Sequence, residues 1–109
     1  MKIVCRKFQP FQKNTLRGFC EVSLPDIGMI IRDVTVHKKN DYTWASAPSK
    51  PQVKDGRVVT DSAGKAQYVP IVEFGSREAR DEFSISVVEA VLKTDEGRRA
   101  LRELTDEAV

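Results

Sequence analysis

The chain contains few of the residues that disulfide frameworks and metal sites require. It contains two cysteines and one histidine among 109 residues. Cys5 and Cys20 are too few for the disulfide framework of a small secreted domain, and neither has the paired Cys or His neighbours of a zinc site. We therefore expect two reduced thiols, no bound metal and no cofactor.

Long hydrophobic runs are also missing. No apolar stretch approaches the roughly 18 to 20 residues of a membrane-spanning helix, and the first residues lack the charged region and apolar stretch of a signal peptide. We therefore expect a cytoplasmic protein that binds no membrane. A length of 109 residues is typical of one domain with a modest core.

Catalytic motifs are the third absence. His37 is the only candidate base for a nucleophile, and beside Lys38 and Lys39 at a predicted strand end it is more simply a surface residue. The sequence has no P-loop and no GxGxxG motif. The carboxylates are scattered along the chain and lack the spacing of metal ligands. They include Asp33, Asp41, Asp55, Asp61 and Glu73. We predict that the protein is not an enzyme and has no small-molecule substrate.

Charge is divided unevenly along the chain. Residues 1–75 contain twelve Lys or Arg and seven Asp or Glu, a net charge of +5, whereas residues 76–109 have a net charge of −3. No acidic residue precedes Glu21. The first part would attract a polyanion that the last part would repel.

The pattern of apolar residues predicts an α+β fold. Period-two runs at roughly 3–10, 15–24, 29–38, 42–47 and 67–74 favour an antiparallel meander of about five strands. Turn residues separate them at 11–14, 25–28 and 39–41. Residues 48–66 are typical of a long mobile loop, with a small hairpin at Asp55-Gly56.

Apolar residues recur at helical spacing after Ser76, which is a predicted N-cap. This pattern predicts one helix that covers the sheet. Thr94 offers a fresh cap for a short second helix, whose apolar residues would be Ala100, Leu101, Leu104 and Ala108. We expect a sheet-plus-helix domain at 1–93 and a helical extension at 94–109.

Symmetric closure of the loop at 11–14 would place Cys5 opposite Cys20, Arg6 opposite Phe19 and Phe8 opposite Arg17. The same reasoning at 25–28 would pair Glu21 with Arg32 and Phe19 with Val34. Both faces of the sheet would then be substantially apolar, with one long helix to cover one of them. We therefore expect a second copy to cover the other face in a homodimer.

Basic and aromatic residues alternate on this predicted sheet, a composition that suits single-stranded nucleic acid because cations contact phosphates and rings stack on bases. The alternative is that the rings fill a core or dimer interface, with Trp44 a packed strand residue, while the cations are merely solvated. The candidate nucleic-acid-binding residues are Arg6, Lys13, Arg17, Lys38, Lys39, Trp44 and Lys50.

Three segments resemble the SpoVG (stage V sporulation protein G) family in order and spacing: LRGFCEVSL at 16–24, IIRDVTV at 30–36 and WASAPSK at 44–50. YVPI at 68–71 is similar to the His-Pro-Ile segment before that family's helix, with Val69 in place of His. The excursion at 51–67 is longer than in the family, and the tail from Thr94 has no firm counterpart. The resemblance implies a sheet with a packed helix, a homodimer and sequence-tolerant binding of DNA or RNA.

The leading hypothesis is therefore a homodimeric regulator of transcription, or a phage-type accessory factor for single-stranded DNA, that binds nucleic acid without covalent chemistry. Its rival is a protein-interaction adaptor that docks through a strand edge or the last helix and binds no nucleic acid. Salt dependence separates them, because affinity for phosphates falls steeply as salt rises.

Overall fold

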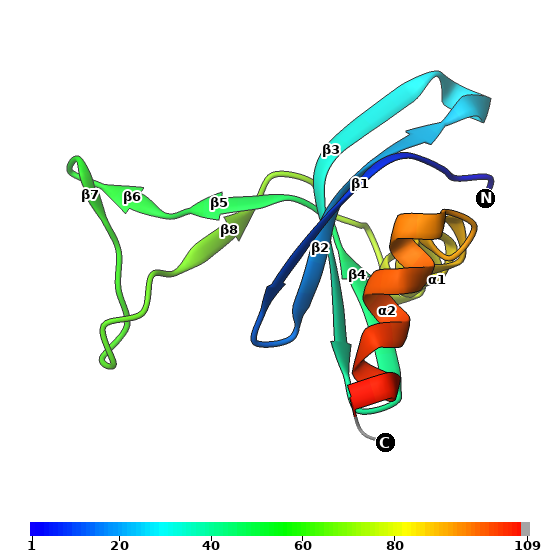
Figure 1. Cartoon of the computed structure of the whole chain (residues 1–109). Coiled ribbons are helices and arrows are strands. Elements are labelled where there is room, and N and C mark those ends of the chain that lie inside the picture. Colours follow the sequence, from blue (N-terminus) through cyan, green and yellow to red (C-terminus); the bar gives the residue numbers. More distant parts are fainter. Residues whose placement is uncertain (108–109) are drawn as a thin grey trace.

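The computed structural model describes the backbone of residues 1–107 and the side chains as far as Arg102, and it confirms the α+β fold (Figure 1). Four antiparallel strands form one sheet in the order β1-β2-β3-β4, so the meander has four strands rather than about five. The elements are β1 (Val4–Lys13), β2 (Leu16–Leu24), a 3-10 turn (Pro25–Ile27), β3 (Met29–Lys39), β4 (Tyr42–Ser46), α1 (Arg77–Val91) and α2 (Asp95–Glu107).

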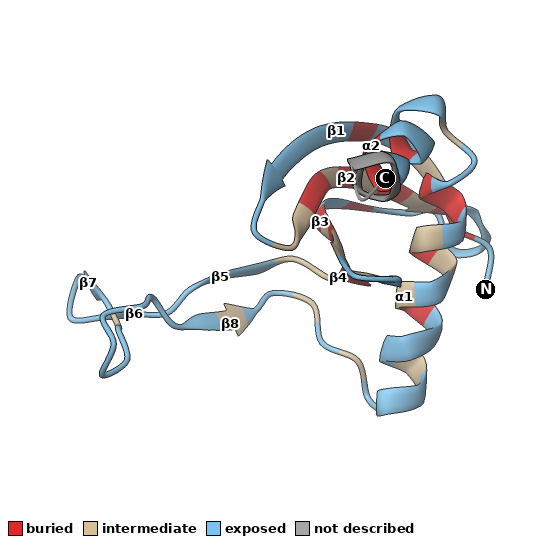
Figure 2. Cartoon of the chain, turned by 60° about the horizontal axis from the view of Figure 1, so that its bottom comes forward, coloured by how far each residue is buried: buried red, intermediate tan, exposed pale blue. Residues whose placement is uncertain are grey.

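The core lies between one face of this sheet and the two helices (Figure 2). Phe83, Val87 and Val91 of α1 are fully buried against it, as are β-branched residues of β2 and β3. Each such side chain contributes roughly 1.5 to 3 kcal/mol when removed from water. The buried strand residues include Val22, Val34 and Val36, which therefore define the inner face of the sheet.

Both predicted helix caps are confirmed. Ser76 Oγ accepts a hydrogen bond from the Ala79 amide at 3.1 Å, and Thr94 Oγ1 accepts one from the Gly97 amide at 3.0 Å. Ala100 and Leu101 of α2 are buried in the same core, whereas the side chain of Leu104 and all of Ala108 lie outside the described part. No helix within residues 1–107 is long and apolar enough to span a membrane.

The predicted register of the first hairpin is wrong. The turn is the two residues Asn14-Thr15, because Asn14 adopts a left-handed conformation (φ 54°) that Asn tolerates well. Two irregularities in β1 shift the pairing further, so Cys5 faces Val22 and Phe8 faces Cys20. Phe8 is therefore a core residue and does not alternate with arginines on an open face. The two other predicted pairs, Arg6 with Phe19 and Phe8 with Arg17, do not form either.

The second hairpin agrees with the prediction only near its turn. Leu24 faces Met29 and Val22 faces Ile31, as the symmetric turn requires. Asp33 then adopts a left-handed conformation (φ 61°) where the register shifts by one residue. Phe19 consequently faces Thr35 and not Val34. The third hairpin closes at Lys39 and Tyr42, where turn residues predicted it.

Residues 48–71 form an arm that projects away from the sheet and helices (Figures 1 and 2). The fifth predicted strand belongs to this arm, where β8 (Tyr68–Pro70) pairs with β5 (Ser49–Pro51). Beyond them, β6 (Val53–Lys54) pairs with β7 (Arg57–Val58) around the predicted Asp55-Gly56 turn. The segment expected to be a mobile loop is thus a hydrogen-bonded ribbon.

Gly18 lies on the inner face beneath the ring of Phe8. A Cβ atom at this position would come within 2.4 Å of Phe8 Cζ and 2.8 Å of the Gln9 carbonyl oxygen. Gly18→Ala should therefore lower the free energy of unfolding by roughly 1 to 3 kcal/mol, the usual cost of overpacking. Gly75→Ala is the matched control because its Cβ would meet nothing within 4 Å. Equal melting temperatures for the two variants would contradict this packing.

Candidate nucleic-acid interface

The sheet face that points away from the helices is called here the outer face. Successive side chains of a strand point to opposite sides, so the neighbours of the core residues lie on it. Phe19, Thr35 and Ser46 form one row across three strands, and His37 pairs with Trp44 in the next. Phe11 joins them because its ring centroid lies 5.9 Å from that of Phe19. The outer face is therefore rich in rings.

Three of these rings form a stack at the β3–β4 edge. The Trp44 ring lies 5.3 Å from that of His37, with planes 7° apart, and 5.3 Å from that of Tyr42, with planes 20° apart. Trp44 is half-buried, whereas Tyr42 is 68% exposed. The ring that remains most available to an incoming planar group is therefore that of Tyr42.

Two threonine hydroxyls fix the His37 ring. Nδ1 lies 3.0 Å from Thr15 Oγ1 and Nε2 lies 3.0 Å from Thr35 Oγ1. Burial, and secondarily the positive charge of Arg17, lower the pKa of His37 below its ordinary value. With both nitrogens hydrogen-bonded and the neutral form favoured, the His37 ring is held in place against the Trp44 ring.

Cations surround one carboxylate on the outer face next to Phe19. Glu21 forms ion pairs with Arg6 at 3.3 Å and with Arg32 at 3.0 Å, and Lys7 lies opposite Glu21 in the register of β1 and β2. The Arg32 side chain is 70% exposed. A small hollow between these groups is lined by Lys7, Gln9, Phe19, Cys20, Glu21, Arg32 and Asp33. Three cations against Glu21 and Asp33 leave this cluster net positive.

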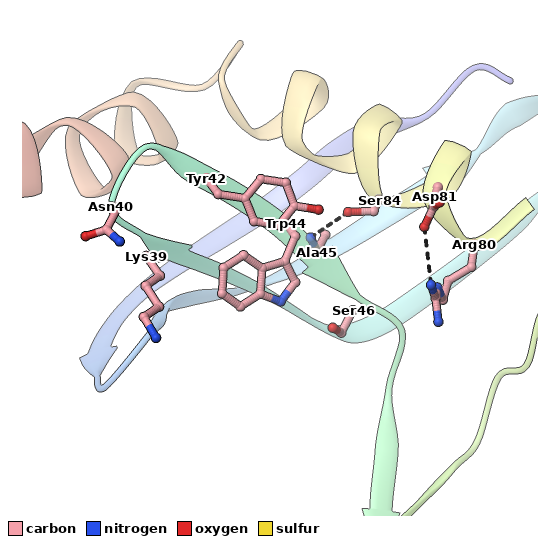
Figure 3. Close-up of a pocket in the computed structure, with 9 residues that line it drawn as sticks. All are labelled: Lys39, Asn40, Tyr42, Trp44, Ala45, Ser46, Arg80, Asp81 and Ser84. Carbon is pink, nitrogen blue, oxygen red and sulfur yellow. Dashed lines mark hydrogen bonds and ion pairs between the residues drawn. The ribbon is translucent and has the colours of Figure 1, made fainter. Parts of the chain in front are cut away.

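A second, open pocket of about 590 Å³ lies between β4 and α1 (Figure 3). Trp44, Ser46 and Lys39 border it on the strand side, and Arg80 borders it on the helix side, paired with Asp81 at 3.5 Å. The Ala45 amide donates to Ser84 Oγ at 2.9 Å, which satisfies a backbone donor at the edge of the sheet. The pocket thus extends the ring stack toward two cations.

Two of the candidate residues serve the fold. Arg17 is only 8% exposed, and its guanidinium donates to the carbonyls of Asn14 at 2.6 Å and Leu16 at 2.9 Å. Lys38 Nζ donates to the carbonyl of Leu101 at 2.8 Å and so helps to fasten α2. Both side chains are therefore engaged in bonds within the fold.

The other five candidates are distributed over four places. Arg6 belongs to the Glu21 cluster, Lys39 and Trp44 border the pocket of Figure 3, and Lys13 and Lys50 are exposed at the first hairpin's end and on the arm. Lys7, Arg32, Tyr42 and Arg80 also lie in these places and were not predicted from the sequence. Tyr42 had a usable signal, since it lies two residues before Trp44 on the same strand.

The two cysteines are free thiols, as expected. Although they are not directly opposed, their side chains meet diagonally across β1 and β2. The Cys20 thiol donates a hydrogen bond to Cys5 Sγ, and this bond, together with burial, raises the pKa of Cys20. The Cys20 thiol is therefore protonated and unreactive at neutral pH.

Among the described residues, no group of three or more His, Cys, Asp or Glu side chains could hold a metal ion. No protein-family model, curated protein or solved structure matches the chain. Assignment of a function therefore depends on the geometry of the outer face and on the sequence motifs.

The lowered pKa of His37 has a measurable consequence for stability. The unfolded chain, whose histidine has the ordinary pKa of about 6.5, binds a proton more readily than the folded chain. Stability should therefore be constant above pH 6.5 and fall as the pH drops from there through the folded pKa.

Because the chain has one histidine, a single imidazole resonance in an NMR titration reports this pKa directly. His37→Gln should remove the stability change attributable to this pH range. A titration midpoint above 6.5 would contradict the description of the ring as buried beside Arg17.

Proposed function

We propose that the protein is a non-catalytic nucleic-acid-binding regulator or accessory factor, related to the SpoVG family and acting as a cytoplasmic homodimer. One observation carries the proposal: rings and cations share the outer face, on the side of the sheet that the helices leave open. The motif order WASAPSK after IIRDVTV supports the family relationship independently.

The arrangement suits single strands better than a duplex. Bases of a single strand are free to stack on an exposed ring such as Tyr42, whereas those of a duplex are already stacked on one another. Phosphates of the same strand would follow Arg6, Lys7 and Arg32 beside Phe19, and Lys39 beside Tyr42. Such binding depends on charge and stacking and therefore tolerates many sequences.

Salt dependence tests the proposal against the adaptor alternative. Affinity for labelled single-stranded DNA, duplex DNA and RNA should be measured by fluorescence anisotropy at two salt concentrations. We expect the tightest binding for single strands and a steep loss of affinity as salt rises. Arg32→Ala should reduce the salt slope by about one unit, the value for one lost phosphate contact.

Lys93→Ala is the matched control, because Lys93 is exposed at the end of α1 and not on the outer face. It should leave both affinity and salt slope close to those of the wild type. If the wild-type protein binds none of the three nucleic acids even at low salt, the proposed function is wrong.

Tyr42 and Trp44 should differ when truncated. Tyr42→Ala removes an exposed ring, so affinity should fall by roughly 1 to 3 kcal/mol with little change in salt slope or melting temperature. Trp44→Ala removes the centre of the stack and should lower the melting temperature as well. Thermal unfolding measured beside affinity separates the two roles. Unchanged binding by Tyr42→Ala would exclude it as the stacking ring.

A further inference from the structure

The arm is a ribbon with two chemically different faces. Residues that pair across strands share a face, and successive pairs alternate between faces. Lys54 pairs with Arg57 on one face, and Val53 pairs with Val58 on the other. Nearer the root, Lys50 and its partner Val69 continue the first face, and the pairs Pro51–Tyr68 and Ser49–Pro70 continue the second. The first face thus carries the basic side chains of the ribbon, and the second is uncharged and mostly apolar.

The apolar face is open to solvent. Val53 is 61% exposed, Val58 48% and Tyr68 62%. These side chains and Pro51 carry no charge, so another apolar surface could cover them without burying an unpaired charge. A two-stranded ribbon is marginally stable alone in water, and neither of the two described helices reaches the arm (Figure 1). Covering this face would therefore stabilise the ribbon.

We propose that the apolar face of the arm packs on the same face of the arm of a second copy. The proposal rests on the homodimer of the proposed function and names its interface. A twofold axis brings each arm against an identical, uncharged surface, so no charged side chain is buried in the contact. Lys50, Lys54 and Arg57 of both copies then point outward, where phosphates can reach them.

Charge on the arm favours this orientation. Its basic residues Lys50, Lys54, Arg57 and Lys65 outnumber Asp55 and Asp61. Asp55 lies in the tip turn, and Asp61 Oδ1 accepts hydrogen bonds from the amides of Ala63 and Lys65. Packing basic face on basic face would bring like charges together, whereas packing apolar faces keeps them apart and hydrated.

The size of the interface sets its strength. Four apolar residues per copy give a contact at or below the lower end of specific protein interfaces. We therefore expect a dimer that dissociates on dilution and forms at tens of micromolar. Two joined arms also hold two outer faces together, so a long single strand that reaches both copies gains from multivalency.

The test is the mass in solution of the full chain and of charge-neutral variants of the apolar face. In Val53→Glu combined with Val58→Lys, the new side chains face each other and can form an ion pair that maintains the hairpin, and the net charge is unchanged. Light scattering should give the mass of two chains for the wild type and of one chain for this variant. Tyr68→Gln, at the other end of the face, should also give a monomer without changing the net charge.

Lys54→Ala combined with Arg57→Ala is the matched control on the opposite face, and it should remain a dimer. Wild type that is monomeric at tens of micromolar, or apolar-face variants that remain dimeric, would overturn the proposal. Binding of a short oligonucleotide that spans one copy separates this failure from that of the proposed function. The monomeric variants should bind it as the wild type does, whereas loss of binding by every protein would refute nucleic-acid binding alone.

Discussion

The packing of α1 on the inner face of the sheet is the constraint on which the other features depend. Phe83, Val87 and Val91 are fully buried on the sheet side of α1, which contacts β1 and β4, and this packing decides which side of each strand is buried. Because side chains alternate along a strand, the residues between the buried ones are committed to the outer face. The chain has no further helix among its described residues for that side. Aromatic rings that could have served a core are therefore left at the surface, where they can stack on a ligand.

The elements of the fold were predictable from local sequence, but their registers were not. Ser76 and Thr94 hold caps that require only a hydroxyl before a helical pattern, and Asn40 and Gly56 mark tight turns. The first hairpin was misplaced because Asn14 closes a two-residue turn where the sequence also allows a longer loop. The bulge at Asp33 depends on a backbone conformation that no composition signal specifies. Each register error moved a face assignment: Phe8 was predicted opposite Arg17 and instead pairs with Cys20 in the core, which agrees with the alternative that its ring fills a core.

The sequence predicted that the candidate site combines basic and aromatic side chains, but it identified only some of the residues. A basic side chain in a strand has the same sequence signal whether it faces solvent, bonds a turn carbonyl as Arg17 does, or fastens a helix as Lys38 does. Only the tertiary structure separates these roles. The alternation of basic and apolar residues, Lys50 with Pro51 and Val53 with Lys54, indicates the two faces of the arm. It was missed because proline and glycine made the whole segment look like a loop.

The central claim is that nucleic acid lies on the outer face of the sheet and not on the helices. Photo-crosslinking tests it most directly. A single strand that carries iodouracil at each position in turn is bound to the protein at low salt and irradiated. The protein is then digested, and the crosslinked residues are identified by mass spectrometry. Crosslinks should concentrate on Tyr42 and Phe19, with Phe11 at the margin. Crosslinks confined to peptides of α1 and α2 would contradict the account.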